Sequence, residues 1–345
     1  MISIDQLSEV KASADAAEIR EKYCDNGYVV VRNLLDRAKD LQPTLDEYAT
    51  VLDREARAWH AAGELASDYA DLPFEERIIK IVAETGDRIY DYFRIFFNPP
   101  SATKADTPLH YGPAIFGLLT HPRLLDVIAA IIGSEITVNP VNVVRIKAPE
   151  RYLPPDHNYH VGLTAAWWHQ DQSVYSEDIN DIDMLTVWLP LTDADKDMGC
   201  LQVVPGSHKG DLSLHCISKL QHKTGIPEML LGPVRHNIET KVGDVHFHHR
   251  RLQHGSLPNL SDRLRFSFDL RYQPTSQAHG ESAGVPGQTM VPGFIARSPS
   301  QPEREMRDWR EWAAYQEEMR QQFMAIDWEN APAANQFSSD HRYCI

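Results

Sequence analysis

Residues 258–272 have the sequence PNLSDRLRFSFDLRY, a turn followed by the alternating pattern of a β-strand over residues 264–272. Other short β-rich runs precede this one, each bounded by Gly, Pro, Asn or Asp. They span residues 136–138, 141–147, 165–169, 184–189, 201–204 and 244–248. Such evenly spaced short strands predict a jelly roll or barrel, not a parallel sheet of alternating strands and helices.

Four side chains of the quoted stretch have the same parity: Arg263, Arg265, Ser267 and Arg271. Successive side chains of a strand point to opposite faces, so these four are expected on one face. A buried arginine needs an anion, and its planar guanidinium matches a carboxylate. For Arg263 and Arg271 we favour pairing with carboxylates of the protein, such as Asp262 or Asp269. Arg265 is a candidate for binding the carboxylate of a metal-chelating 2-oxo acid.

The regions on either side of these strands are predicted to be mostly helical. One early strand is expected over residues 28–32, and helices over residues 3–23, 41–70, 74–84, 123–132 and 303–324. Residues 277–293 are rich in Gly, Pro and Ser and are expected to form a loop. No linker is evident, so we expect a single domain over residues 1–345. Its parts are 1–135, mostly helical, 136–275, the β core, and 276–345, a loop and a helix.

Composition restricts the possible partners. The chain of 345 residues has 34 Lys+Arg against 49 Asp+Glu, a net charge of −15, which argues against nucleic acid and anionic membranes. No apolar run approaches the roughly 20 residues that span a bilayer, and no secretion signal is evident. Four cysteines in this length do not predict a disulfide framework. We therefore expect a cytoplasmic protein.

The strongest local motif is residues 167–171, WWHQD. On a strand, His169 and Asp171 would point to the same side and could bind one ion together. With one further histidine they would form the two-histidine, one-carboxylate triad of Fe(II) oxygenases. The alternative is a buried histidine bonded to its neighbour, because one His-x-Asp is expected by chance among sixteen histidines.

A third ligand is available in residues 243–256, GDVHFHHRRLQHGS. The pattern predicts a turn, a strand and then His254-Gly255 at the mouth of another strand. His254 would come from a strand distant in sequence but adjacent in a rolled sheet. His246 and His248 share one face of the earlier strand, and the cluster could instead be an adventitious zinc site or a polar rim. We expect at most one of these histidines to be a ligand.

Taken in order, these motifs resemble the phytanoyl-CoA dioxygenase-like family of Fe(II)/2-oxoglutarate oxygenases. The resemblance covers most of the chain. It includes DNGYVVV at 25–31, THP at 120–122, HQD at 169–171, GCL at 199–201, PGSH at 205–208, GD at 243–244 and HGS at 254–256. Each motif is modest alone, but all of them in order and at compatible spacings are specific.

The resemblance implies a double-stranded β-helix of the cupin type and a set of site residues. The metal ligands for Fe(II) would be His169, Asp171 and His254. The residues expected around 2-oxoglutarate are Arg265, eleven residues after the last ligand, Ser267 as a weaker candidate, Trp188 and Gln170. Trp188 and Gln170 could equally serve packing. The implied reaction consumes 2-oxoglutarate and O2, releases succinate and CO2 and hydroxylates a C–H bond. The carboxylate of Asp171 favours hydroxylation over halogenation.

The substrate does not follow from the family. Segments 41–98 and 148–166 look longer than the family needs, and no peroxisomal signal is evident at residues 341–345. Side chains near the metal motif hint at a polar or cationic small molecule, with simple surface exposure as the alternative. They are Tyr159, His160, Tyr175 and Asp178.

Two other functions are alternatives to the oxygenase. One is a non-catalytic, cupin-like metal- or ligand-binding protein, which would need no arginine for a co-substrate. The other is a metal-dependent hydrolase with a zinc-activated water, which would act without O2 or 2-oxoglutarate. The sequence does not indicate an oligomeric state.

Overall fold

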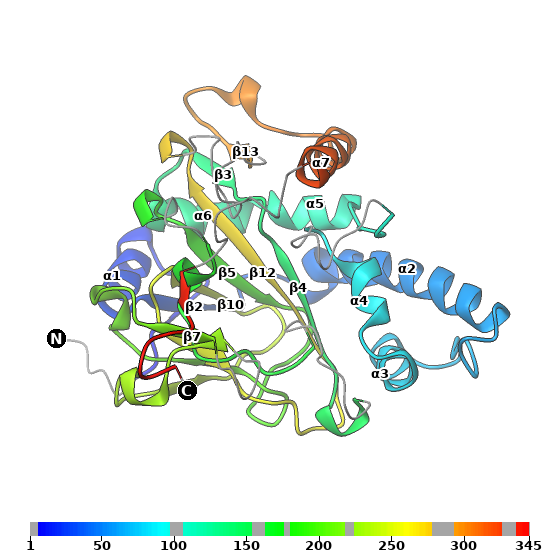
Figure 1. Ribbon diagram of the computed structural model, residues 1–345. Helices are drawn as coiled ribbons and strands as arrows, with labels where there is room; N and C mark the ends of the chain where they lie inside the picture. Colours follow the sequence, from blue (N-terminus) through cyan, green and yellow to red (C-terminus); the bar gives the residue numbers. More distant parts are fainter. Residues whose placement is uncertain are drawn as a thin grey trace.

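The structure is a computed structural model that describes residues 6–96, 106–153, 163–175, 180–217, 224–277, 293–325 and 336–344. Its largest element is an eight-stranded sheet with the order β1-β2-β10-β5-β12-β3-β13, in which β4 also pairs with β12 (Figure 1). These strands are β1 (Glu9–Lys11), β2 (Tyr28–Arg32), β3 (Ile136–Val138), β4 (Val143–Lys147), β5 (Leu185–Pro190), β10 (Val245–His249), β12 (Arg265–Pro274) and β13 (Phe294–Arg297). All of the pairs are antiparallel except β1 with β2.

Two three-stranded sheets complete the β structure, with the orders β11-β6-β9 and β14-β7-β8. Their strands are β6 (Leu201–Val203), β7 (His215–Ile217), β8 (Thr224–Gly225), β9 (His236–Ile238), β11 (His254–Ser256) and β14 (Phe337–Ser338). All of these strands have only two or three residues, too short for a visible alternation, and for this reason the sequence predicts only β6 and the strand that carries His254.

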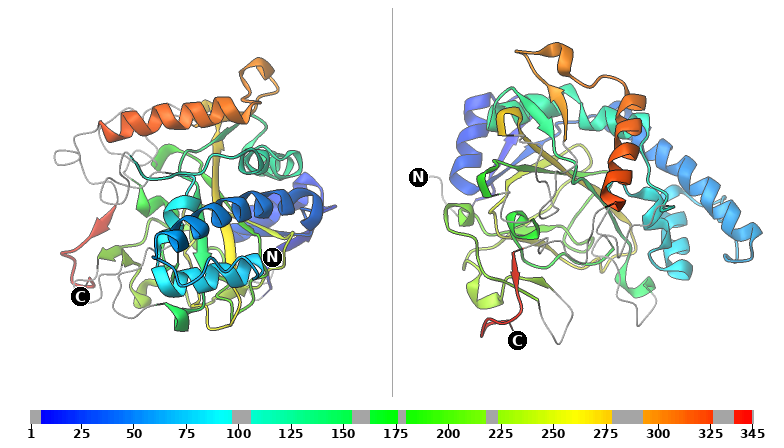
Figure 2. Two further views of the ribbon diagram at one scale, coloured as in Figure 1. Left: turned by 90° about the vertical axis from the view of Figure 1, so that its right-hand side faces the viewer. Right: turned by 45° about the horizontal axis from the view of Figure 1, so that its top comes forward.

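Seven α-helices surround the sheets in the part of the chain that the structure describes. They are α1 (Ala16–Asn26), α2 (Gln42–Ala61), α3 (Phe74–Thr85), α4 (Arg88–Phe93), α5 (Pro113–Leu119), α6 (Pro122–Ile132) and α7 (Trp309–Met324). Figures 1 and 2 show α2, α3 and α4 together on one side of the molecule, with α7 lying across α5. The helices therefore flank a β core, as the sequence predicts.

The outward face of the large sheet forms the main hydrophobic core. Phe266, Phe268 and Leu270 of β12 lie on this face with Val187 of β5, and the helices cover them. The ring of Tyr48 on α2, for example, lies 5.3 Å from that of Phe266. The residues between them on the same strands point inward, toward the small β11-β6-β9 sheet. Because successive side chains of a strand point to opposite faces, neighbouring residues lie alternately in the core and in the space between the sheets.

Several predicted boundaries differ from the observed ones. Residues 165–169 are not a strand, and only His169 forms an isolated bridge, with His254. Within the helix expected over residues 3–23, the structure instead has a second early strand, β1, and α1 begins only at Ala16. The helix expected over residues 41–70 ends at Ala61, and the C-terminal helix begins at Trp309 instead of residue 303. The predicted loop over residues 277–293 lies almost entirely outside the described residues.

The C-terminal segment is joined covalently to the body of the protein. Cys216 on β7 forms a disulfide with Cys344, and β14 pairs in parallel with β7. Cys24 and Cys200 are free. The sequence analysis expected no disulfide framework and did not foresee this single bond, because pairing between cysteines 128 residues apart cannot be deduced from spacing.

Contrary to the expectation from the sequence, one segment, Pro113–Ile132, is long and apolar enough to be a candidate membrane span by length and composition, with a mean hydropathy of 1.7. In the structure it is divided at Thr120 into the helices α5 and α6. Residues of both helices, including Ile115 and Ile128, belong to the main core. The fold therefore accounts for the apolar character of this segment without a membrane.

Candidate metal centre

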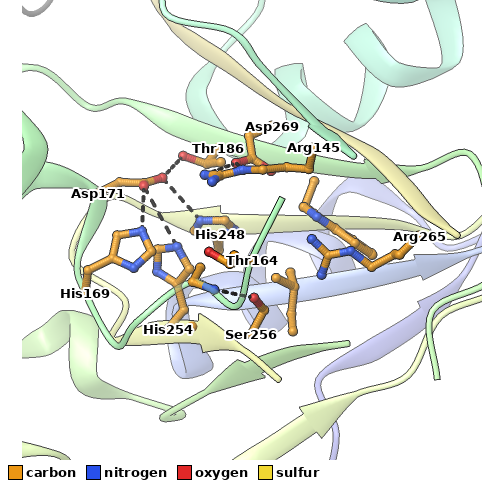
Figure 3. Close-up of a pocket in the computed structure, with 14 residues that line it drawn as sticks. Arg145, Thr164, His169, Asp171, Thr186, His248, His254, Ser256, Arg265 and Asp269 are labelled. Carbon is orange, nitrogen blue, oxygen red and sulfur yellow. Dashed lines mark hydrogen bonds and ion pairs between the residues drawn. The ribbon is translucent and has the colours of Figure 1, made fainter. Parts of the chain in front are cut away.

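Three side chains that are far apart in the sequence meet between the large sheet and the β11-β6-β9 sheet. His169, Asp171 and His254 each offer one potential ligand atom, and these atoms lie within 4.8 Å of one another (Figure 3). The Nε2 atoms of His169 and His254 lie 3.6 and 3.8 Å from Oδ1 of Asp171. The structure thus brings together the three residues that the sequence proposes as metal ligands.

The backbone reaches this geometry in a different way from the one expected. His169 and His254 form an antiparallel bridge, with reciprocal N–H···O bonds of 2.8 and 2.9 Å. Asp171 is the first residue of a 3-10 helix, Asp171–Val174, and so does not continue a strand. The turn after Gln170 therefore directs the carboxylate of Asp171 toward the imidazoles, whereas strand alternation was predicted to do so.

Backbone carbonyls fix the orientation of both imidazoles. Nδ1 of His169 lies 2.6 Å from the carbonyl oxygen of Trp167, and Nδ1 of His254 lies 2.9 Å from that of Leu252. A carbonyl only accepts, so each Nδ1 carries a proton, and each Nε2 is the atom left to face a metal. Burial, with His169 nearby, lowers the pKa of His254 well below its usual value, so this ring stays neutral.

Asp171 is buried and held by three side chains of the large sheet. Arg271 of β12 lies 3.3 Å from Oδ1, while Thr186 of β5 donates to Oδ2 at 2.5 Å and Nε2 of His248 on β10 lies 3.3 Å from Oδ2. Burial favours the neutral acid, but the charge of Arg271 and the contacts with the histidines hold the pKa of Asp171 well below its usual range. The carboxylate is therefore anionic and fixed in orientation before any metal binds.

The partners of two arginines differ from the examples that the sequence suggested. Arg271 does pair with a protein carboxylate, but this carboxylate is the proposed metal ligand Asp171. Arg263 pairs with Asp195. Strand parity places a side chain on a face but does not say which acid stands opposite, and Asp195 and Asp171 lie on distant segments.

Arg265 lies at the other end of the same pocket (Figure 3). Its guanidinium donates to the carbonyl of Gly199 at 2.6 Å and lies 5.6 Å from the ring of Trp188, and its Nε is buried without a partner among the described residues. Burial lowers the pKa of Arg265 to about 10, which leaves it charged at neutral pH. The nearby acid Asp269 is 2.7 Å from Arg145.

The remaining predicted residues lie away from the pocket or outside the described residues. Gln170 is buried, with its amide donating to the carbonyl of Arg251 and its amide oxygen accepting from the N–H of Ser213. Ser267 and Tyr175 are also buried and do not line the pocket. Tyr159, His160 and Asp178 lie outside the described residues.

Several residues that line the pocket were not predicted to be site residues. They are Arg145, Thr164, Ala166, Thr186, Leu201, His248, Gly255, Ser256 and Asp269. Thr186 and His248 lie on the same inward face as Trp188 and Arg265, so the alternation of β5 and β10 contained the information needed to find them. The Thr164–Ala166 segment has no regular structure and gave no comparable signal.

Comparisons with known proteins identify a family and its relatives. A family model described as Phytanoyl-CoA dioxygenase (PhyH) matches residues 23–267. The phytanoyl-CoA dioxygenase domain-containing protein 1 of Bos taurus is 26% identical over 267 residues, with 72% of this chain and 86% of that protein covered. A probable alpha-ketoglutarate-dependent hypophosphite dioxygenase of Stutzerimonas stutzeri is 25% identical over 265 residues, with 72% and 76% covered.

A solved structure shares the fold. The apo form of the non-heme monooxygenase ThoJ superimposes with a TM-score of 0.54 at 20% identity, and the alignment covers 89% of this chain and 97% of that one. The predicted double-stranded β-helix with helical flanks is therefore confirmed.

Proposed function

Because the chain belongs to the phytanoyl-CoA dioxygenase family of iron- and 2-oxoglutarate-dependent oxygenases, we propose that it hydroxylates an unactivated C–H bond of a small molecule, with release of succinate and CO2. One observation carries the proposal. A three-sided set of metal donors, His169, Asp171 and His254, lies in one pocket with Arg265, a buried arginine that has no carboxylate partner among the described residues.

The residues present fit the iron that the family implies. Two imidazoles and one carboxylate suit Fe(II), and three protein donors leave further positions free on a six-coordinate ion. When bound, the iron together with 2-oxoglutarate and O2 supplies the oxidising chemistry, and the protein supplies orientation and exclusion of water. The unpartnered Nε of Arg265 is the feature expected of a residue that awaits an anionic ligand.

The residues of the proposed site have separate roles in this reaction. His169 and His254 would hold the ion with their Nε2 atoms, and Asp171 would add the negative charge that Arg271 keeps in place. Arg265 would bind the distal carboxylate of 2-oxoglutarate, and the ring of Trp188 lies 5.6 Å from its guanidinium. The side chains that line the pocket enclose a volume of about 20 Å³.

The names of the relatives leave the substrate open. They include enzymes named for phytanoyl-CoA, for hypophosphite and for 1-deoxypentalenic acid. Such different molecules share a mode of oxidation and no common shape. We therefore propose a small-molecule substrate without assigning one of these to the chain.

The test is formation of succinate by the purified protein with Fe(II), 2-oxoglutarate and O2, alone and with a panel of small metabolites. We expect succinate above the metal-free background, further stimulation by the true substrate, and loss of both in His169→Ala. His60→Ala, on the exposed surface of α2, is the matched control and should behave as the wild type. Succinate at wild-type rates from His169→Ala would refute the assignment, and turnover of a metabolite without O2 would favour a hydrolase.

A further inference from the structure

Two buried cations stand directly opposite one another on neighbouring strands of the large sheet. The register of β12 against β4 pairs Arg265 with Lys147, and their exposed fractions are 2% and 1%. Like charges placed directly opposite in a sheet destabilise it, and burial in a medium of low dielectric increases the cost. Such an arrangement calls for an anion that offsets it.

The described residues do not supply that anion. Nζ of Lys147 donates to two neutral acceptors, Oγ of Ser256 and the carbonyl of Leu257, each at 2.7 Å. Of the two acids that line the pocket, Asp269 pairs with Arg145 and Asp171 pairs with Arg271. No carboxylate in the described part of the chain forms an ion pair with Lys147 or Arg265.

Ser256 connects Lys147 to the pocket. Its Oγ accepts hydrogen bonds from Nζ of Lys147 and from the backbone N–H of Ala166, at 2.7 and 2.9 Å. A hydroxyl has two acceptor sites and one proton, so both acceptor sites are filled and the proton is left to donate. Ser256 lines the pocket and points into it in Figure 3, so its hydroxyl proton is available to an acceptor there.

We propose that Lys147 is a positioning residue for the co-substrate: through Ser256 and through its own charge, it strengthens binding of the distal carboxylate of 2-oxoglutarate beside Arg265. This inference rests on the proposed function. It adds a second cation to the recognition of that carboxylate. Burial and the neighbouring Arg265 lower the pKa of Lys147 well below its usual range, and an arriving carboxylate opposes both effects.

The test compares two ligands that differ only at the distal end. 2-Oxoglutarate has a carboxylate there, and 2-oxopentanoate has a methyl group. Dissociation constants are measured without O2 on the Fe(II)-loaded full chain, by calorimetry or by the visible absorption of the chelate. In Lys147→Gln, which removes the charge but keeps a polar N–H donor, we expect affinity for 2-oxoglutarate to fall about tenfold and affinity for 2-oxopentanoate to stay within about twofold.

Controls separate this inference from the proposed function. Lys241→Gln, at an exposed position, should leave both constants unchanged. Lys147→Arg, which keeps the charge, should retain most of the preference for 2-oxoglutarate, and it serves as the second variant if Lys147→Gln does not fold. Equal losses for the two ligands, or no loss for either, would overturn the role of Lys147 while leaving the oxygenase assignment intact. Failure of the wild type to bind 2-oxoglutarate would overturn both.

Discussion

The two faces of the large sheet are formed by the same strands but have different roles. Outward residues of β5 and β12, such as Val187 and Phe268, are apolar and packed under helices. Their immediate neighbours Thr186 and Asp269 point inward and line the pocket. One face therefore provides the stability of the fold, and the other provides the charges and donors of the site. Substitutions at neighbouring positions of one strand should therefore affect different properties, and their effects should also differ in size.

The largest expected effect is on the outward face. Phe268 is 1% exposed and packs near Tyr48 and Phe266, so Phe268→Ala should lower the free energy of unfolding by about 3–5 kcal/mol. Its neighbour on the inward face, Ser267, has a buried hydroxyl without a partner among the described residues. Ser267→Ala should therefore change stability by less than about 0.5 kcal/mol. Urea unfolding of the two variants measures the contrast, and similar losses in both would contradict it.

We expect substitutions on the inward face to weaken metal binding more than they lower stability. Thr186→Val removes the hydroxyl that donates to Asp171 but keeps the shape of the side chain. Loss of such a supporting contact should weaken Fe(II) binding about 10- to 100-fold. The matched control is Thr137→Val, which breaks a hydrogen bond to Thr275 on a distant part of the sheet. Fe(II) titration should show a change in the first variant alone; equal affinities would mean that Thr186 does not position Asp171.

A smaller effect concerns pH. His246 lies on the inward face with both ring nitrogens unpartnered among the described residues, and burial, followed by His248 and Arg32, lowers its pKa well below the usual value. As pH falls below about 6.5, the unfolded chain takes up a proton here that the folded chain does not, so stability decreases. His246→Leu removes this contribution. From about pH 7.5 to about pH 5.5, the metal-free variant should lose about 1.4 kcal/mol less stability than the wild type.

Urea unfolding at several pH values measures this difference. Phe268→Ala is the appropriate comparison, because an apolar position on the outward face should lower stability equally at every pH. Parallel pH curves for His246→Leu and the wild type would show that His246 is not kept neutral by burial.

The inward and outward faces were predictable from the sequence where strands are long. Residues 264–272 alternate over enough positions to place Arg265 and Arg271 on one face, and the structure confirms that placement. Chemical type, spacing and family resemblance also indicated the ligand candidates His169, Asp171 and His254, and the structure brings these three side chains together. Short strands such as β11 and β9 have too few residues for a pattern, so their existence depends on tertiary pairing.

What the sequence could not provide is the identity of partners across the fold. Arg271 and Asp171 are 100 residues apart, and only the folded chain shows that they pair. His248 was recognised as part of a histidine cluster, but its position beside Asp171 follows from the packing of β10 against β5. The opposition of Lys147 and Arg265 likewise depends on the register between β4 and β12, which no local pattern specifies.

The most direct test of the metal site is an anaerobic titration of the metal-free protein with Fe(II) and then 2-oxoglutarate, followed by the visible charge-transfer absorption of the chelate. We expect equimolar binding of both in the wild type, loss of both in Asp171→Ala, and loss of 2-oxoglutarate alone in Arg265→Met. Unchanged absorption in Asp171→Ala, or undiminished affinity for 2-oxoglutarate in Arg265→Met, would contradict the assignment of the inward face as the active site.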